Sequence, residues 1–227
     1  MKTLLIDYGS GNLRSCAKSL EAAGFGANGH EMVVSNDPEM ARDADALVLP
    51  GQGHFRQVME SFLESGFEQV VRDHIAAGKA FLGICVGMQI LFDRSEESHL
   101  PGLGVIPGEI KRFPKPAPNS NLEKPEFQKP EFQKLSVPQM QWNTLEPVGE
   151  SPLMRGLGQQ PFAYFVHSYY APIEVAQNGA RTNYGLDFLS VVSVGNVHAT
   201  QFHPEKSQRV GLRILENFRD WAAEHNA

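Results

Sequence analysis

The sequence predicts an α/β fold with a mixed, mainly parallel central sheet flanked by helices. Two observations indicate this fold. Over the first hundred residues, short apolar runs alternate with stretches of helical periodicity, which is typical of a parallel sheet covered on both faces. In the second half, strand-like runs follow one another through turns, which favours antiparallel additions to the same sheet.

The first half supplies the predicted parallel strands and their helices. The apolar runs predict strands over Lys2–Ile6, Met32–Ser35, Ala46–Leu49 and Ala80–Ile84. Helical periodicity or acidic composition predicts helices over Gly11–Ala23, Pro38–Arg42, Phe55–Leu63 and Phe67–Ala77. Cys16 falls on the apolar stripe of the first helix, with Leu13 and Leu20, so we interpret it as a core residue.

The second half supplies shorter strands and one long helix. Strands are predicted over Gly108–Phe113, Val137–Trp142, Ala163–Ser168, Phe188–Val194 and Val197–His203. The last helix, Ser207–Ala223, places Val210, Ile214, Phe218 and Trp221 on one side, a stripe that indicates packing on the core.

Length and composition place the chain among ordinary globular proteins. Its 227 residues fit one domain, 1–227. A formal charge of −6 does not indicate binding to nucleic acid or to an anionic membrane. No stretch approaches the roughly 18 apolar residues of a membrane span. The start lacks the features of a signal peptide. With only two cysteines, a disulfide framework is excluded, a zinc site is not expected, and a cytoplasmic location is predicted. We expect no metal and no cofactor.

The segment 114–134 differs from the rest in composition. It carries five prolines and few branched apolar residues, and Lys-Pro-Glu-Phe-Gln occurs twice in succession over 124–133. Such a composition is typical of a surface loop without a packed core. We therefore predict a loop insertion and no domain boundary.

Cys85 lies in a pattern that predicts a nucleophile. A buried strand leads into Gly83-Ile-Cys85-Val-Gly87, and an apolar helix with Met88, Leu91 and Phe92 is predicted to follow. A sharp strand-to-helix turn crowds the backbone on both sides of its tip, where only glycine fits cheaply. The turn exposes the sulfur at the carboxyl edge of the sheet, and the following helix N-terminus favours the thiolate.

His203 and Glu205 are the candidates for a base and its orienting partner. They lie in Phe202-His-Pro-Glu205, at the end of a predicted strand and before the last helix. A thiolate nucleophile needs such a base within hydrogen-bond reach. In isolation, a surface histidine and a helix-capping acid would explain the pair equally well. The predicted nucleophile Cys85 favours the interpretation as a base and its orienting partner.

The glycine-rich turn Pro50–Gly53 follows another predicted strand and is a candidate oxyanion hole. Backbone N–H groups around Gln52 and Gly53, with that of Val86, would face the developing oxyanion. A phosphate-binding loop is disfavoured here, because this turn has no G-x-G-x-x-G spacing and no following lysine. We interpret His54 as an exposed residue at a helix start.

These motifs together resemble those of the class I, triad-type glutamine amidotransferases. The narrower resemblance is to the glutaminase subunits that serve imidazole glycerol phosphate synthases, and it rests on segments spread over nearly the whole chain: Asp7–Leu13, Gly87–Gln89, Gln141–Asn143, Val166–Tyr170 and His203–Ser207. It implies a flavodoxin-like fold and a catalytic triad of Cys85, His203 and Glu205. It also implies a glutamine site formed by Gly51, Gln52, Gly53, Val86, Gln89, Glu97, Ser168 and Tyr169.

The resemblance also implies a partner. Ammonia would pass through a heterodimer interface into a (β/α)8-barrel synthase (cyclase) subunit, which makes imidazole glycerol phosphate and an aminoimidazole carboxamide ribotide in histidine biosynthesis. The interface would include Asn12, Trp142 and Lys206. The chain departs from the family at Gln139 and Gln141, where the family usually has His and Gly; Gln141 would reshape the ammonia path beside Trp142.

Three other functions share part of this pattern. A glutaminase serving anthranilate or aminodeoxychorismate synthase would typically have His at position 88, where this chain has Met88. A non-catalytic interaction subunit would have no need for the complete Cys85, His203 and Glu205 set. A free-standing cysteine hydrolase has the same chemistry and differs only in being independent of a partner.

Overall fold

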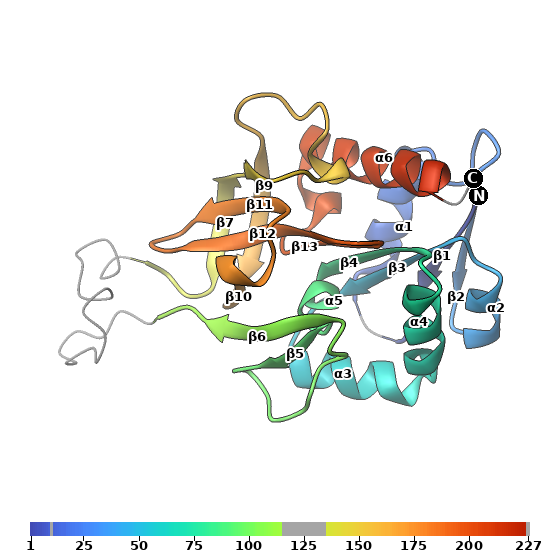
Figure 1. Ribbon diagram of the computed structural model, residues 1–227, viewed down its shortest axis with the longest axis horizontal. Coiled ribbons are helices and arrows are strands. Elements are labelled where there is room, and N and C mark those ends of the chain that lie inside the picture. The colour runs from blue at the N-terminus through green and yellow to red at the C-terminus, as the bar shows by residue number, and fades with distance from the viewer. Residues whose placement is uncertain (10, 115–134, 226–227) are drawn as a thin grey trace.

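The computed structural model describes residues 1–9, 11–114 and 135–225, and one large sheet crosses them (Figure 1). Its parallel half has the order β2-β1-β3-β4-β13. These strands span Glu31–Ser35, Lys2–Ile6, Ala46–Gly51, Ala80–Cys85 and Val197–Thr200. Every residue of β3 and β4 is buried, as expected for central parallel strands covered on both faces. The prediction of a mainly parallel sheet is confirmed.

The other half of the sheet is mostly antiparallel and continues through β12, β10, β6 and β5. These strands span Asp187–Val194, Tyr169–Pro172, Ile106–Arg112 and Phe92–Ser95. In addition, β11 (Gly179–Asn183) pairs with β12, and β8 (Glu146–Val148) pairs with β11. The sequence predicted β6 and β12 within a few residues. It missed β5, β8, β10 and β11, which are short and lack a clear alternation.

Helices cover the sheet in two layers (Figure 1). On one side lie α1 (Leu13–Ala22) and α6 (Gln208–His225); on the other lie α3 (Phe55–Glu64), α4 (Phe67–Ala76) and the short α5 (Val86–Gln89), with α2 (Pro38–Arg42) beside α4. Short 3-10 turns span Pro152–Met154 (η3), Ile173–Val175 (η4) and Pro204–Lys206 (η5). Ile214 and Phe218 of α6 are fully buried, as its apolar stripe predicted.

Two predicted strands form a sheet of their own. β7 (Gln139–Thr144) and β9 (Phe162–His167) pair with each other, antiparallel, and join no strand of the large sheet. The prediction that they extend the central sheet is therefore wrong. The alternation of side chains marks a strand but does not reveal its partner, because strand pairing is decided by contacts distant in sequence.

Two boundaries also differ near the expected site. The helix after Cys85 ends at Gln89, and Phe92 begins β5, so the predicted longer apolar helix is wrong. Strand β13 ends at Thr200, three residues before His203, which instead caps the turn η5. Both regions carry buried apolar residues that suit a strand or a helix equally well.

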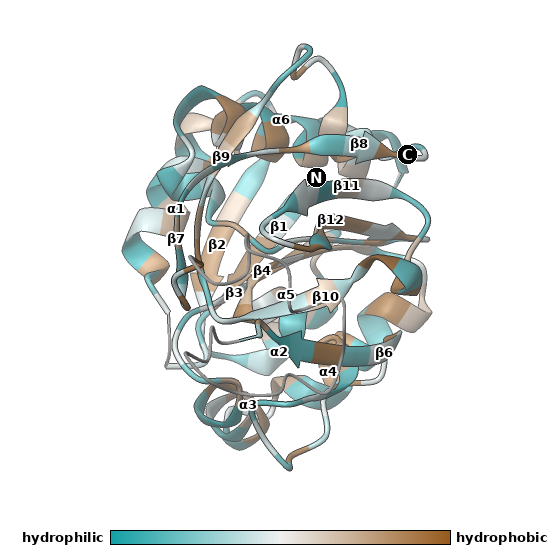
Figure 2. Cartoon of the chain, turned by 90° about the vertical axis from the view of Figure 1, so that its left-hand side faces the viewer, coloured by the Kyte–Doolittle hydropathy of each residue, from teal (hydrophilic) through white to brown (hydrophobic). Residues whose placement is uncertain are grey.

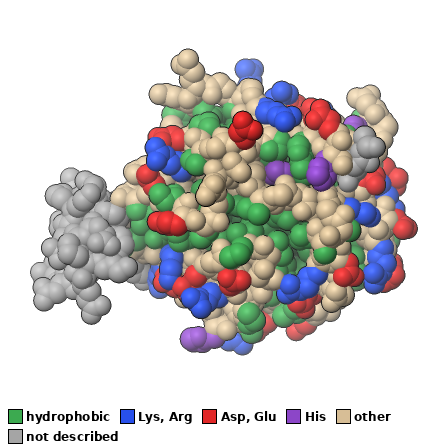
Figure 3. Space-filling view, viewed as in Figure 1, with side chains coloured by type: hydrophobic (Ala, Val, Ile, Leu, Met, Phe, Trp, Pro, Cys, Tyr) green, Lys and Arg blue, Asp and Glu red, His purple; other side chains and the backbone are tan. Residues whose placement is uncertain are grey.

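Figure 2 shows brown, hydrophobic residues on strands of the central sheet and in patches on the helices. On the face shown in Figure 3, apolar side chains gather across the middle, with charged side chains mostly around them. Within the described ranges, no helix is both long and apolar enough to cross a membrane. Apart from Pro114, the predicted loop 114–134 and its repeat lie outside the described residues.

Candidate active site

A pocket of about 390 Å³ opens at the carboxyl ends of β3 and β4. This is the edge at which open α/β sheets bind their ligands. Strands, turns and loops from both halves of the chain line it, and the lining residues are Gln52, Gly53, His54, Cys85, Val86, Gln89, Glu97, Pro138, Val166, His167, Ser168, Tyr169, His203 and Lys206.

Cys85 is the last residue of β4 and adopts a backbone conformation that is rare for a side-chain-bearing residue. Its φ is 55° and its ψ is −110°. Such a conformation costs on the order of 1–3 kcal/mol and persists only when its surroundings hold it. The strained turn directs the chain from β4 straight into α5 and leaves the thiol on the pocket wall, although Cys85 as a whole is only 3% exposed.

Close backbone packing holds this turn. A Cβ on Gly87 would lie 2.1 Å from the Leu49 carbonyl oxygen, and one on Gly51 would lie 2.2 Å from the Gly87 nitrogen. A Cβ on Gly83 would lie 2.8 Å from the Gly87 oxygen. None of these distances tolerates a side chain, because the neighbouring atoms belong to the backbone. Glycine is therefore required at Gly87 by the approach of α5 to β3, and at Gly83 by the approach of β4 to α5.

His203 lies beside Cys85 and is oriented by Glu205. Its Nδ1 is 2.8 Å from Glu205 Oε1, and both side chains are 5% exposed. Burial disfavours the charged imidazolium, but the Cys85 sulfur and the Glu205 carboxylate, by charge and by hydrogen bond, outweigh burial and raise the pKa of His203 to about 10.

The His203 segment is itself anchored. Ser207 Oγ donates to the His203 carbonyl oxygen at 2.8 Å and accepts from the Tyr164 backbone N–H at 3.0 Å. This hydroxyl ties the turn η5 to β9, so the position of His203 depends on the two-stranded sheet.

Seven of the eight residues of the predicted glutamine site line the pocket: Gln52, Gly53, Val86, Gln89, Glu97, Ser168 and Tyr169. Gly51 does not; it pairs with Cys85 across β3 and β4 and packs against Gly87. Its place is therefore behind the turn, where it supports Cys85.

Gln89 lines the pocket from α5 and is 3% exposed. Its Nε2 donates to the Tyr169 carbonyl oxygen at 3.3 Å and to Gln201 Oε1 at 3.2 Å. Gln201 Nε2 in turn lies 3.9 Å from Cys85 Sγ. Sequence reasoning assigned no role to Gln201 or His167, although a polar residue inside an apolar run is a signal that could have marked Gln201.

Glu97 has partners on the opposite wall. Its carboxylate accepts from the Phe55 backbone N–H at 2.8 Å and lies 2.9 Å from His54 Nδ1. It therefore caps the N-terminus of α3, where a negative charge is favourable. The His54 side chain is 80% exposed, in agreement with the interpretation of His54 as an exposed residue at a helix start.

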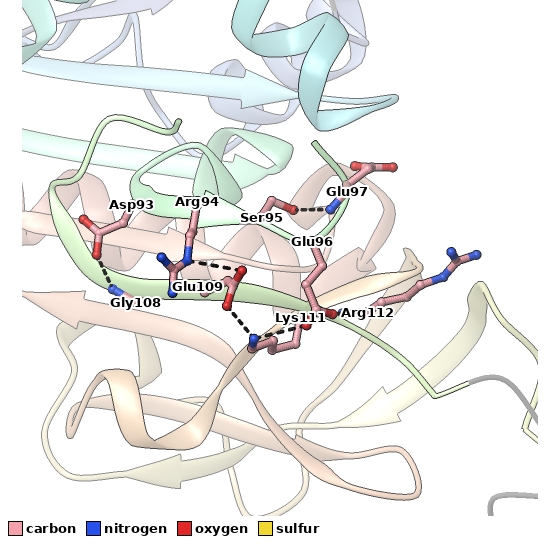
Figure 4. A network of polar contacts seen from close by, with 9 residues as sticks. All are labelled: Asp93, Arg94, Ser95, Glu96, Glu97, Gly108, Glu109, Lys111 and Arg112. Carbon is pink, nitrogen blue, oxygen red and sulfur yellow. Dashed lines mark hydrogen bonds and ion pairs between the residues drawn. The ribbon is translucent and has the colours of Figure 1, made fainter. Parts of the chain in front are cut away.

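A polar network fixes the segment that carries Glu97 (Figure 4). Glu96 accepts from the Arg112 backbone N–H at 2.8 Å and pairs with Lys111 at 3.1 Å. Ser95 Oγ accepts from the Glu97 backbone N–H at 3.2 Å. These contacts join the end of β5 to β6, so Glu97 projects into the pocket from a braced segment.

The three predicted interface residues lie near the mouth of the pocket or on the chain's surface. Lys206 is exposed and lines the pocket, Trp142 is 42% exposed on β7, and Asn12 precedes α1. Met140, at 61% exposure, lies two residues before Trp142 and on the same face of β7, and Phe162 of β9 is 46% exposed. The two-stranded sheet thus presents an apolar face to solvent.

Cys16 does not belong to the site. It is 2% exposed in α1, and burial, with the nearby Glu205 charge, raises the pKa of its thiol. A thiol kept protonated in an apolar setting is inert, which agrees with its interpretation as a core residue.

The arrangement supports nucleophilic attack on a carbonyl. A thiol, an imidazole that can accept and return a proton, and a carboxylate behind the imidazole lie in contact, the combination that acyl transfer requires. Gln52, Gly53 and Val86 line the same pocket, where donors to an oxyanion are needed.

Comparison with known proteins supports the same chemistry. The family model described as class I glutamine amidotransferase matches residues 4–221. The imidazole glycerol phosphate synthase subunit HisH of Deinococcus radiodurans is 51% identical over 220 residues, covering 96% of this chain and 93% of that protein. The protein of the same name from Thermus thermophilus is 46% identical over 216 residues, covering 95% of each.

Solved structures agree on the fold. A glutamine amidotransferase crystal structure superposes with a TM-score of 0.65 at 21% identity, covering 97% of this chain and 98% of the other. The glutaminase domain of Trypanosoma brucei CTPS, solved with bound acivicin, superposes with a TM-score of 0.64 at 13% identity, covering 99% and 94%.

Proposed function

This chain belongs to the class I glutamine amidotransferase family, and from that premise we propose that it is the glutaminase subunit of an imidazole glycerol phosphate synthase. It hydrolyses glutamine to glutamate and ammonia for histidine biosynthesis. The observation that carries the proposal is the contact between Cys85, His203 and Glu205 in a pocket at the carboxyl edge of the sheet.

In the first half of the reaction, Cys85 Sγ attacks the carbonyl carbon of the glutamine side-chain amide. The carbonyl oxygen becomes an oxyanion that backbone N–H groups near Gln52, Gly53 and Val86 stabilise. His203 gives a proton to the amide nitrogen, the C–N bond breaks, and ammonia leaves. The product on the enzyme is a γ-glutamyl thioester on Cys85.

In the second half, neutral His203 takes a proton from water, whose oxygen attacks the thioester carbonyl. The C–S bond then breaks, glutamate leaves, and the thiolate–imidazolium pair is restored. Glu205 does not touch the substrate; it holds the imidazole with Nε2 toward the reacting atoms and stabilises the imidazolium. The remaining pocket residues, including Gln89, Glu97, Ser168 and Tyr169, bind the amino-acid part of glutamine.

The relatives' names describe a subunit of a synthase, so a partner subunit accompanies this function. We assign that partner as the (β/α)8-barrel cyclase, bound as a heterodimer through Asn12, Trp142 and Lys206, with ammonia passing between the subunits. The apolar face formed by Met140, Trp142 and Phe162 supports this assignment, because large exposed apolar patches mark association surfaces. The complex is cytoplasmic, with the chain acting as one domain.

The alternatives are less well supported. Near-full-length identity of 51% to a protein of this name argues against a glutaminase of the anthranilate type. The braced Cys85 turn argues against a non-catalytic copy, since its backbone strain has no use without a nucleophile.

The test is reconstitution with the cognate barrel subunit. The Cys85→Ala complex should lose glutamine-dependent synthesis and keep ammonia-dependent synthesis, because only the nucleophile is removed. Cys16→Ala is the matched control and should keep both activities. Loss of both activities in Cys85→Ala would assign Cys85 a structural role.

The dependence on a partner is tested in the same preparation. The isolated chain should hydrolyse glutamine slowly, and the barrel subunit with its nucleotide should stimulate it strongly. Fast hydrolysis by the isolated chain would instead indicate a free-standing hydrolase.

A further inference from the structure

Gln201 lies between β13 and the His203 turn and is completely buried. Its backbone N–H donates to the Ser190 carbonyl oxygen at 2.9 Å, which fixes the residue against β12. Its side-chain Nε2 lies 3.9 Å from Cys85 Sγ. The sulfur therefore has an amide beside it as well as the imidazole of His203.

The orientation of this amide follows from a backbone carbonyl. The Tyr169 oxygen can only accept, so Gln89 must present its NH₂ group to it, at 3.3 Å. The same NH₂ group lies 3.2 Å from the Gln201 side chain, which must present its oxygen there. The Gln201 NH₂ group then faces Cys85 Sγ. In this series of hydrogen bonds, the Tyr169 oxygen fixes the orientation of the Gln89 amide, which in turn fixes that of the Gln201 amide.

His167 contacts the Tyr169 oxygen at which this series of hydrogen bonds begins. Its Nδ1 lies 2.7 Å from the same Tyr169 oxygen, so Nδ1 carries a hydrogen. Burial lowers the pKa of His167 to about 4, which keeps the ring neutral. The Nε2 atom is then an acceptor, and it lies 3.0 Å from Gln139 Oε1, which also only accepts. With its NH₂ group turned to Nε2, Gln139 would satisfy its otherwise unpartnered buried nitrogen within the described chain.

We propose that Gln201 is a further catalytic residue, whose side-chain N–H donates to the Cys85 thiolate. The proposal rests on the proposed glutaminase function. A thiolate in a residue that is 3% exposed has little water to solvate it, and a buried anion without donors is costly. The Gln201 amide supplies a donor that is held in place before glutamine binds, and Gln89 and Tyr169 hold its orientation.

The test is the pH dependence of Cys85 alkylation by iodoacetamide in the full chain, followed by peptide mass spectrometry. Gln201→Met keeps the length and removes the donor, so the pH of half-maximal alkylation should rise by about one unit. Gln201→Glu places an acceptor beside the sulfur and should raise the pH of half-maximal alkylation further than Gln201→Met does. Gln89→Met leaves the Gln201 amide free to rotate and should raise this pH less than Gln201→Met does.

Turnover is measured in the complex with the barrel subunit. Gln201→Met should lower the glutaminase kcat about tenfold, which is ~1.4 kcal/mol of activation free energy. Ser190→Ala is the matched control, because it removes the hydroxyl of a fully buried residue on the neighbouring strand; its alkylation profile and kcat should match wild type.

Unchanged alkylation profiles in folded Gln201→Met, Gln201→Glu and Gln89→Met would overturn the role of Gln201. If Gln201→Met does not fold, Gln201→Glu and Gln89→Met report on the same hydrogen bond. An inactive wild-type complex would refute the proposed function alone, since alkylation does not depend on glutamine turnover.

Discussion

The Nδ1 atom of His203 lies 2.8 Å from Glu205 Oε1, and the two side chains are equally buried at 5% exposure. The residues are separated only by Pro204, which begins the turn η5. A base and its orienting acid are thus contained in one short turn, while the nucleophile comes from a strand more than a hundred residues earlier. The other Glu205 oxygen is buried with no hydrogen-bond partner among the described residues, so the carboxylate depends on His203.

Glu205→Gln should lower glutamine hydrolysis by about 10²–10⁴-fold, because an amide neither stabilises the imidazolium nor fixes its tautomer. The pKa of folded His203 is raised from 6.5 to about 10. Cys85 and Glu205 both contribute to this rise. The stability that they give the charged imidazole is fully present below about pH 6.5 and is lost as the pH rises toward 10, and Glu205→Gln removes the Glu205 share of it. The difference in unfolding free energy between wild type and variant should shrink over that range.

Denaturant unfolding at several pH values measures this difference. Glu224→Gln is the matched control, since Glu224 lies 3.9 Å from Arg155 and its side chain is 72% exposed; such exposed pairs contribute little. If the difference in unfolding free energy between wild type and Glu205→Gln stays constant across pH 6.5–10, His203 does not lose its charge over that range and the raised pKa is contradicted.

Gly87→Ala should destabilise the fold and abolish glutaminase activity. The new Cβ would lie 2.1 Å from the Leu49 carbonyl oxygen, so β3 or the Cys85 turn must move. Overpacking of this kind costs about 1–3 kcal/mol or more. Gly195→Ala is the control: φ of Gly195 is 57°, but no atom of the described residues lies within 4 Å of a Cβ built there, so the substitution should cost only about 1 kcal/mol. Thermal unfolding and activity assays measure the stability and activity of the two variants. Equal losses of stability in Gly87→Ala and Gly195→Ala would argue against close packing at Gly87.

Trp142→Ala should weaken binding of the barrel subunit by about 2 kcal/mol or more, since exposed aromatic residues often dominate interfaces. Its ring lies against Tyr164, 5.8 Å between centroids, and is presented by the two-stranded sheet. Val194→Ala, at an equally exposed apolar residue on β12, should leave binding unchanged. Titration calorimetry measures both affinities; an unchanged affinity for Trp142→Ala would remove Trp142 from the interface.

Unfolding free energy should fall as the pH drops from about 6.5 toward 4. Burial lowers the pKa of His74, His167 and His198 to about 4 in each case. Below pH 6.5 the unfolded chain binds protons that the folded chain excludes, so each histidine contributes a slope of up to ~1.4 kcal/mol per pH unit. His198→Gln removes one such group and should flatten the slope by about one proton. Denaturant unfolding between pH 4 and 7.5 measures this slope; an unchanged slope would show that His198 is charged when folded.

Part of this molecule was predictable because its signals are local. Strands β3 and β4 are continuous apolar runs, and burial on both faces leaves no other place for them. The glycines around Cys85 mark a tight turn for steric reasons that hold in any fold. The roles of Cys85, His203 and Glu205 follow from residue chemistry and family resemblance, and they stay predictions until the variants are measured.

The sequence by itself therefore determined the buried apolar runs of the core strands, the turn that carries Cys85 and the closeness of His203 to Glu205, since each depends on neighbours within a few residues. Only the tertiary structure decided that β7 and β9 form a separate sheet, that Glu97 caps α3, and that Gln201 faces the sulfur. Those outcomes depend on contacts between distant segments: Gln89 and Gln201 are 112 residues apart and meet at 3.2 Å. Local periodicity carries no information about such pairs, because it specifies which face of an element is buried and not what covers it.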